Sequence, residues 1–244
     1  MRHVEPDDLV QLAFARQRGL SGFGAQGQDA LAASRIAIVG MGGLGCPVAL
    51  YLVAAGVGGL TLIDSDSVSA TNLHRQVLYG PADVGSRKVA AAARALGERA
   101  PWTTVTAIDA RLTAHDAAPV LAGHDVIVDA TDTFASRRLI AAAAREHHAP
   151  LVWGAVTGWH GQVTVFDGSI GLDDVFPDDP DLAFDSCDGG PVLGTMCGQV
   201  GTAMATEAVK LAAGAGTSLA GTLAILDART GRWRDVPVKR RVHA

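Results

Sequence analysis

The chain has 244 residues, of which 48% are hydrophobic and 18% charged, with a formal net charge of −5 at pH 7. Its mean hydropathy of +0.23 excludes intrinsic disorder as the main state, and its acidic balance gives no basic footprint for nucleic acid. The three cysteines form no C-x-x-C pair, which excludes a four-cysteine zinc site and a disulfide framework. With no signal-peptide pattern and no apolar stretch of about 20 residues, we expect a cytoplasmic protein that contacts no membrane.

Apolar periodicity predicts helices that alternate with buried strands along the first two thirds of the chain. Two short helices, 6–18 and 26–33, are expected before the first strand. A polar, irregular segment at 65–85 follows the second strand, and the helix after it has Ser86 as its expected N-cap. The predicted strands are 35–39, 60–63, 103–108, 125–130, 151–153 and 162–166, and the intervening helices are 43–55, 86–99, 114–121 and 136–147.

The last third of the chain has a different pattern. An acidic, loop-like segment carries eight aspartates between Asp167 and Asp188 and no Lys or Arg. A helix at 192–213 and an antiparallel pair of strands at 223–226 and 232–236 are expected after it.

Strands that alternate with helices favour an α/β fold. We predict a Rossmann-like, doubly wound, mainly parallel sheet that is extended by C-terminal antiparallel strands and preceded by N-terminal helices. The expected organisation is a single domain over 1–244, divided into an N-terminal helical arm (1–34), a nucleotide-binding core (35–167), an acidic crossover loop (168–190) and a C-terminal helix with strands (191–244).

A glycine-rich turn joins the first predicted strand to the next helix. Gly40–Gly45 reads G-x-G-x-x-G, and glycines at such a turn let the backbone approach phosphate groups at a helix N-terminus. Asp64 ends the second strand, 19 residues after Gly45, where a carboxylate can accept ribose hydroxyls. Together these features indicate a nucleotide site. The alternative is a tight turn beside a solvated aspartate.

Charged residues beyond the glycine turn favour ATP over a dinucleotide. Arg75 and Lys88 place two cations within and just after the irregular segment, and a reacting triphosphate needs cations to stabilise its departing charge. Asp132 follows the strand predicted at 125–130, on the nucleotide side of the sheet, where a lone carboxylate suits Mg²⁺ held jointly with phosphate oxygens. Asp132 is alternatively the N-cap of the following helix.

Eight short motifs, in fixed order, resemble one known family. They are Phe14–Gln17, Gln26–Leu31, Ser34–Gly45, Asn72–Gln76, Val84–Lys88, Ala130–Asp132, Gly161–Phe166 and Glu207–Lys210. In order and spacing they resemble the MoeB/ThiF adenylyltransferases, the bacterial relatives of ubiquitin-activating enzymes. The resemblance covers nearly the whole chain.

The resemblance implies a reaction and its partners. Such enzymes use ATP and Mg²⁺ to adenylate the C-terminal glycine of a small ubiquitin-like sulfur carrier protein that ends in Gly-Gly, and they release pyrophosphate. The carboxylate is already ionised at neutral pH, so the reaction needs alignment and charge stabilisation and no general base. Because no rhodanese-like domain follows, a separate protein is expected to donate the sulfur. Which carrier and which pathway are involved is left open.

The resemblance also implies a role for each site residue. Phosphates would contact Asn72, Arg75, Gln76 and Lys88, while Asp64 would bind ribose and Asp132 would hold Mg²⁺. The family is a homodimer in which an N-terminal arginine reaches the neighbour's ATP. Arg16 matches that arginine, although it is alternatively a solvated helix charge. The implied nucleotide-binding set is completed by Gly40, Gly42, Gly43, Gly45 and Thr133, of which Thr133 stands where the family often has Asn.

The three cysteines have separate interpretations. Cys187 matches the position of the ThiF-type cysteine that can take the carrier in a covalent acyl link, although the surrounding aspartates would raise the pKa of its thiol. An incidental loop cysteine is the alternative. Cys46 and Cys197 lie in apolar sequence and are expected to be packed. The family commonly has two C-x-x-C pairs that bind zinc, and because this chain has neither, we predict that zinc is absent.

Two other classes of protein share parts of this pattern. A nicotinamide-dependent oxidoreductase would share the glycine turn and Asp64, but would leave Arg75, Lys88 and Asp132 unexplained. A non-catalytic scaffold half of a heterodimeric activating enzyme is expected to have lost these charged residues. Activation of a tRNA-linked carboxylate is disfavoured by the acidic charge.

Overall fold

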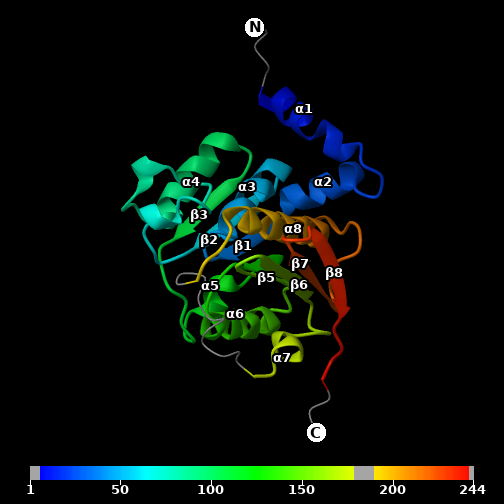
Figure 1. Cartoon of the computed structure of the whole chain (residues 1–244). Coiled ribbons are helices and arrows are strands. Elements are labelled where there is room, and N and C mark those ends of the chain that lie inside the picture. The colour runs from blue at the N-terminus through cyan, green and yellow to red at the C-terminus, as the bar shows by residue number, and fades with distance from the viewer. Residues whose placement is uncertain (1–5, 179–189, 242–244) are drawn as a thin grey trace.

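The computed structural model describes residues 6–178 and 190–241. Its centre is one eight-stranded sheet with strand order β3-β2-β1-β4-β5-β6-β7-β8 (Figure 1). The strands are β1 (Arg35–Val39), β2 (Gly59–Ile63), β3 (Thr104–Ile108), β4 (Val126–Asp129), β5 (Leu151–Thr157), β6 (His160–Phe166), β7 (Thr222–Asp227) and β8 (Arg232–Pro237). This order confirms the predicted Rossmann-like sheet with its C-terminal extension.

The first five strands in the sheet order are parallel, so their carboxyl ends lie along one edge. Val39 at the end of β1 is in register with Ile63 at the end of β2, and also with Asp129 at the end of β4. Ile63 is in turn in register with Ile108 at the end of β3. The segments that leave these strands therefore emerge side by side.

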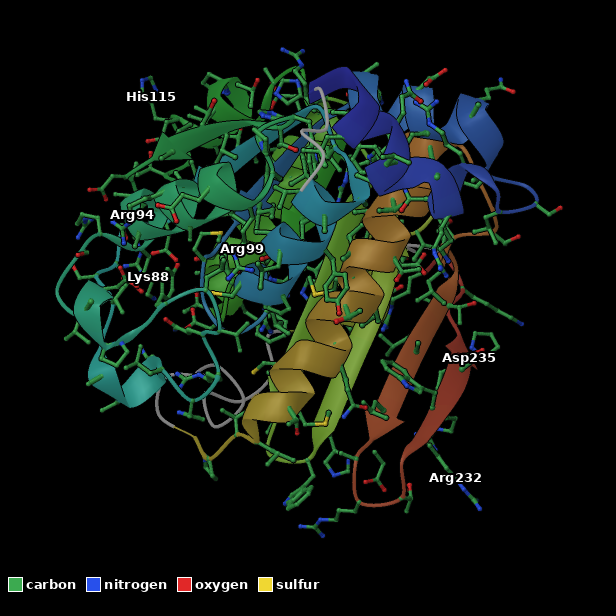
Figure 2. All side chains as sticks on the ribbon, turned by 90° about the horizontal axis from the view of Figure 1, so that it is seen from above. Lys88, Arg94, Arg99, His115, Arg232 and Asp235 are labelled. Atoms are coloured by element: carbon green, nitrogen blue, oxygen red, sulfur yellow. The ribbon has the colours of Figure 1, made fainter. Side chains whose placement is uncertain are left out.

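The remaining strands form the antiparallel part of the sheet. β5 pairs with β6, β6 with β7 and β7 with β8, each in antiparallel register. Figure 2 shows β8, with Arg232 and Asp235, on the opposite side of the molecule from α4 (Lys88–Arg99). The predicted closing pair of strands is thus confirmed, and β8 forms the end of the sheet opposite β3.

Helices cover both faces of the sheet because adjacent strand residues point to opposite sides. Ile36 and Ile38 of β1 belong to one buried cluster, whereas Ala37 and Val39 belong to the other. The first cluster includes side chains from α2, α3, α4 and α8, and the second includes side chains from α5, α6 and α7. Figure 1 shows these two sets of helices on opposite sides of the sheet. The helices other than α4 are α1 (Pro6–Arg18), α2 (Gly24–Ala33), α3 (Gly45–Ala55), α5 (Ala117–Leu121), α6 (Phe134–Glu146), α7 (Leu172–Val175) and α8 (Gly194–Ala213).

Several local predictions differ from the structure. Ser86 is not the N-cap of α4: the helix begins at Lys88, its N-cap position is taken by Arg87, and the backbone N–H of Ser86 donates to the carbonyl of Asp83. The irregular segment contains two short 3₁₀ turns, Ala70–Asn72 and Pro81–Asp83. The acidic segment contains α7, which the sequence pattern did not predict.

Across the described residues, none of the helices combines the length and the apolar character that a membrane crossing requires.

Two glycines should respond in opposite ways to substitution by alanine. At Gly58, a Cβ would lie 1.9 Å from the carbonyl oxygen of Ala32, so Gly58→Ala is expected to cost about 1–3 kcal/mol through overpacking. Gly97 is an exposed residue of α4 with open space around it, so Gly97→Ala is expected to add about 0.5–1 kcal/mol of stability. Urea unfolding of both variants measures these changes, and a stability loss at Gly97 would contradict the packing described for the two sites.

Candidate functional site

A cleft opens at the carboxyl-end edge of β1, β2 and β4. Its walls come from the glycine turn, the segments after β2 and β3, the turn between β4 and α6, and the start of α8. One part is polar and carries most of the charged groups, whereas another is apolar and includes Ile63, Leu112, Leu139 and Ile140. The polar lining residues include Gly40, Gly42, Gly43, Asp64, Asp66, Arg75, Gln76, Lys88, Arg111, Asp132 and Arg137.

The glycine turn is held in place by hydrogen bonds to the peptide groups of Met41. The N–H of Met41 donates to Asp64 Oδ2 at 2.6 Å, and the carbonyl of Met41 accepts the Tyr79 hydroxyl at 2.9 Å. Asp64 Oδ1 accepts the backbone N–H of Asp66 at 2.7 Å. Asp64 therefore ties the end of β2 to the glycine turn, and its carboxylate oxygens have further lone pairs for a ligand.

Two glycines of the turn permit close backbone packing. A Cβ at Gly45 would lie 1.9 Å from the carbonyl oxygen of Gly40, and one at Gly40 would lie 2.7 Å from the carbonyl oxygen of Ala130. Gly40 also has φ of +95°, a conformation that favours glycine. The first contact folds the turn onto the start of α3, and the second brings it against the segment that carries Asp132.

Lys88 is buried at the start of α4, with a relative exposure of 4%. Its Nζ lies 2.7 Å from Asp66 Oδ2, and its backbone N–H donates to the carbonyl of Asp66 at 2.9 Å. Asp66 thus orients the lysine, although sequence reasoning did not single it out. The available signal was its place two residues after Asp64, in the segment that leaves the same strand.

Arg75 and Gln76 are also buried in the cleft wall, and both belong to the predicted set. Arg75 packs against the glycine turn, since a Cβ at Gly43 would lie 3.4 Å from its Cγ. Gln76 is 2% exposed, and its Oε1 has no hydrogen-bond partner among the described residues. A buried amide oxygen of this kind is costly unless something pairs with it.

Asp132 is a half-buried residue of the cleft, in the turn between β4 and α6. The alternative interpretation of Asp132 as a helix N-cap is wrong, because the N-cap of α6 is Thr133, whose Oγ1 accepts the N–H of Ser136 at 3.3 Å. The residue that caps the helix and the residue that lines the cleft are therefore neighbours with different tasks.

Arg137 and Asp129 form a buried charged group that sequence reasoning missed. Arg137 is 3% exposed and lines the cleft, and its guanidinium carbon lies 4.7 Å from the centre of the Phe134 ring. Asp129 is fully buried; burial raises the pKa of its carboxyl group, and the positive charge of Arg137 offsets part of this rise. The available signal was a basic residue on the face of α6 that also carries Ile140 and Ala144, three and seven positions further on.

Four other predicted residues lie outside the cleft lining. Gly45 begins α3, and Asn72 lies in a 3₁₀ turn, where its carbonyl accepts the N–H groups of Arg75 and Gln76. Thr133 caps α6. Arg16 is exposed on α1, a helix that packs against α2. Cys187 lies outside the described residues.

Cys46 and Cys197 are both buried, as predicted. Burial raises the pKa of the Cys46 thiol to about 12, so this cysteine is held as a neutral packed side chain. Cys197 is 2% exposed and contributes to the cleft wall, where a Cβ at Gly43 would lie 2.8 Å from its Sγ. The close approach of α8 to the glycine turn therefore depends on the absence of a side chain at residue 43.

Comparison with known proteins identifies the family. A sequence profile described as the ThiF family matches residues 14–244. The chain belongs to the ThiF family. Its fold, with the glycine turn and Asp64 at one edge of a mixed sheet, is that of a ThiF protein throughout the described residues.

Three curated relatives of this ThiF protein carry adenylyltransferase in their names. It is 38% identical over 243 residues to the molybdopterin-synthase adenylyltransferase of Escherichia coli, with 97% of this chain and 96% of that one covered. It is 40% identical over 235 residues to the sulfur carrier protein adenylyltransferase of Thermus thermophilus, with 93% and 87% covered. It is 37% identical over 234 residues to the probable adenylyltransferase/sulfurtransferase MoeZ of Mycobacterium tuberculosis, covering 93% of this chain but spanning only 60% of that relative's length.

Solved structures share the fold at lower sequence identity. The crystal structure of E. coli MccB with MccA-N7isoASN superposes with a TM-score of 0.83 and 18% identity, and covers 95% of this chain and 72% of that one. At this identity the likeness concerns the fold.

Proposed function

We propose that this ThiF protein is an ATP-dependent adenylyltransferase that activates the C-terminal glycine of a ubiquitin-like sulfur carrier protein as an acyl-adenylate and releases pyrophosphate. The observation that carries the proposal is the gathering of Arg75, Lys88 and Asp132 around the glycine turn in one cleft. The names of the E. coli and T. thermophilus relatives support the same reaction. A hydride-transfer enzyme would have no use for this set of charged groups, and a scaffold subunit would have no need to retain it.

The site residues have distinct tasks in this proposal. The glycine turn and the start of α3 would hold the phosphates, with free N–H groups at a helix N-terminus. Asp64 would bind the ribose, and the apolar part of the cleft would take the adenine. Arg75 and Lys88 would stabilise the charge that develops as pyrophosphate leaves. We assign Gln76 to the phosphates as well, while Gly45, Asn72 and Thr133 would shape the site through the backbone.

Asp132 fits a magnesium site by the chemistry of its donor group. Mg²⁺ usually takes one or two protein carboxylates together with substrate phosphate oxygens, and the cleft presents this carboxylate beside the glycine turn. When bound, the ion would neutralise phosphate charge. We propose that Asp132 holds it, and that no structural zinc accompanies it because the sequence has no C-x-x-C pair.

The partners follow from the same reaction. We propose a carrier that ends in Gly-Gly, a separate sulfur donor protein, a homodimeric enzyme and a cytoplasmic location with no membrane or nucleic-acid partner. Residues 1–244 would act together as one adenylation domain.

Lys88→Met should abolish most of the activity, and Arg94→Met is its matched control. Both residues lie on α4 (Figure 2), but Arg94 pairs with Asp83 and its side chain is 59% exposed, outside the cleft lining. Loss of a cation at the developing charge is expected to lower kcat/KM for ATP–pyrophosphate exchange by about 100- to 1,000-fold. Because the Arg94 side chain is largely exposed and lies outside the cleft lining, the control should keep its rate.

The assay uses ATP, Mg²⁺ and candidate carriers ending in Gly-Gly, and both variants are checked by thermal melting. Equal activity in the two variants would remove Lys88 from the proposed machinery. No exchange by the unmutated protein with any carrier, alongside binding of NAD(H), would overturn the proposed function.

Arg16 should act on the site of the partner subunit. Arg16→Ala and Asp132→Ala are each expected to be inactive as homodimers. Random mixing of equal amounts makes half of the dimers mixed, and each mixed dimer regains one of two sites, so about one quarter of the unmutated activity should return. Exchange rates before and after subunit mixing test this, and a mixture that stays inactive would place Arg16 and Asp132 on the same site.

Cys187 is the proposed acceptor of the activated carrier. Its thiolate would attack the acyl-adenylate, form a thioester and release AMP. Cys187→Ala should therefore keep pyrophosphate exchange but lose the thioester with the carrier and the later sulfur loading, which intact-mass spectrometry can follow. Unchanged sulfur loading in the variant would reject the covalent role.

A further inference from the structure

The turn between β4 and α6 is held from both sides by buried charged residues. Asp129 Oδ1 accepts the backbone N–H of Thr131 at 2.9 Å and its hydroxyl at 2.6 Å. Arg137 Nη2 donates to the carbonyl of Thr131 at 3.3 Å. The peptide groups on both sides of Thr131 are thus fixed, and the next residue is Asp132.

The same turn is fixed against the glycine turn. The N–H of Ala130 donates to the carbonyl of Val39 at 2.9 Å, and the carbonyl of Ala130 leaves no room for a Cβ at Gly40. A shift of Thr131 would therefore alter the distance from Asp132 to the glycine turn. In the proposed function, that distance separates the Asp132 carboxylate from the phosphates.

A contribution to stability does not by itself explain why Asp129 and Arg137 are both buried at this turn. Asp129 is 0% and Arg137 3% exposed, and both form hydrogen bonds with Thr131. Asp129 Oδ2 and Arg137 Nε have no hydrogen-bond partner among the described residues. Burying ionisable side chains is costly unless all their polar atoms are hydrogen-bonded, so two buried groups that are incompletely satisfied indicate a role beyond stability.

We propose that Asp129 and Arg137 are positioning residues that hold the 130–133 turn, and with it Asp132, in its working geometry. This inference rests on the proposed adenylyltransferase function. The pair acts on the ligand through Thr131 and Asp132, much as groups that hydrogen-bond a metal-binding carboxylate tune a metal site.

The main test is the double variant Asp129→Asn/Arg137→Met. It removes both charges with little change in shape, and the amide oxygen introduced at position 129 can still accept from Thr131, so the protein should fold with a melting temperature near that of the unmutated chain. The hydrogen bond from residue 137 to Thr131 is lost. We expect faster amide hydrogen exchange in the 130–133 peptide, and a loss of about 10- to 100-fold in kcat for pyrophosphate exchange.

Arg138→Met is the matched control. Arg138 is the next residue of α6, but it pairs with Asp173 at 2.6 Å and lies outside the cleft lining. This variant should keep both the activity and the amide exchange of the 130–133 peptide. Any effect of losing an α6 arginine in general would show in both variants.

Affinity for the Mn²⁺ complex of ATP separates positioning from direct contact with ligand. If the pair acts through Asp132, the double variant lowers this affinity in the unmutated background and has little further effect in an Asp132→Ala background. Equal losses in the two backgrounds would overturn the proposal. Normal amide exchange in the double variant would overturn the role given to Arg137, because the amide oxygen at position 129 can still accept from Thr131. An unmutated protein without pyrophosphate exchange would contradict the proposed function instead, and the amide-exchange result would still decide whether the pair holds the turn.

Discussion

The site depends on the close approach of three backbone segments at the carboxyl-end edge of the sheet. Gly40 lies between them: its carbonyl meets Gly45 at the start of α3, and its Cα faces the carbonyl of Ala130 after β4. Neither contact leaves space for a Cβ. The absence of two side chains therefore sets how near the glycine turn lies to Asp132, and a nucleotide would have to bridge these two features.

Charged side chains that follow the ends of different strands surround this packed backbone. Asp64 and Asp66 follow β2, and one holds the Met41 peptide while the other orients Lys88. Asp129 ends β4 and, with Arg137, holds Thr131. Carboxylates thus hold both the glycine turn and the side chain of Lys88 in position. Such preorganisation suits a reaction whose main requirement is alignment and charge stabilisation.

The sequence pattern predicted the elements that have strong periodicity or special backbone needs. Strand β1 and helix α1 have the predicted bounds, and the glycine turn was found by its spacing. Helix starts were less predictable. Ser86 has a good capping side chain, but its backbone N–H donates to the carbonyl of Asp83 and its carbonyl accepts from Val68, and α4 begins two residues later, at Lys88. The roles of Asp66 and Arg137 were not predicted, because the sequence does not show which groups a charged side chain will contact in the folded protein.

The alternation of strands and helices, the G-x-G-x-x-G turn and the family could all be predicted from the sequence, because they follow from local periodicity, backbone freedom and motif order. The lack of any C-x-x-C pair among its three cysteines led to the prediction that zinc is absent. The folded structure was needed to show that Thr133, and not Asp132, caps α6 and that the Arg137 side chain lines the cleft. Those outcomes depend on burial and on hydrogen bonds between elements, which no local pattern contains.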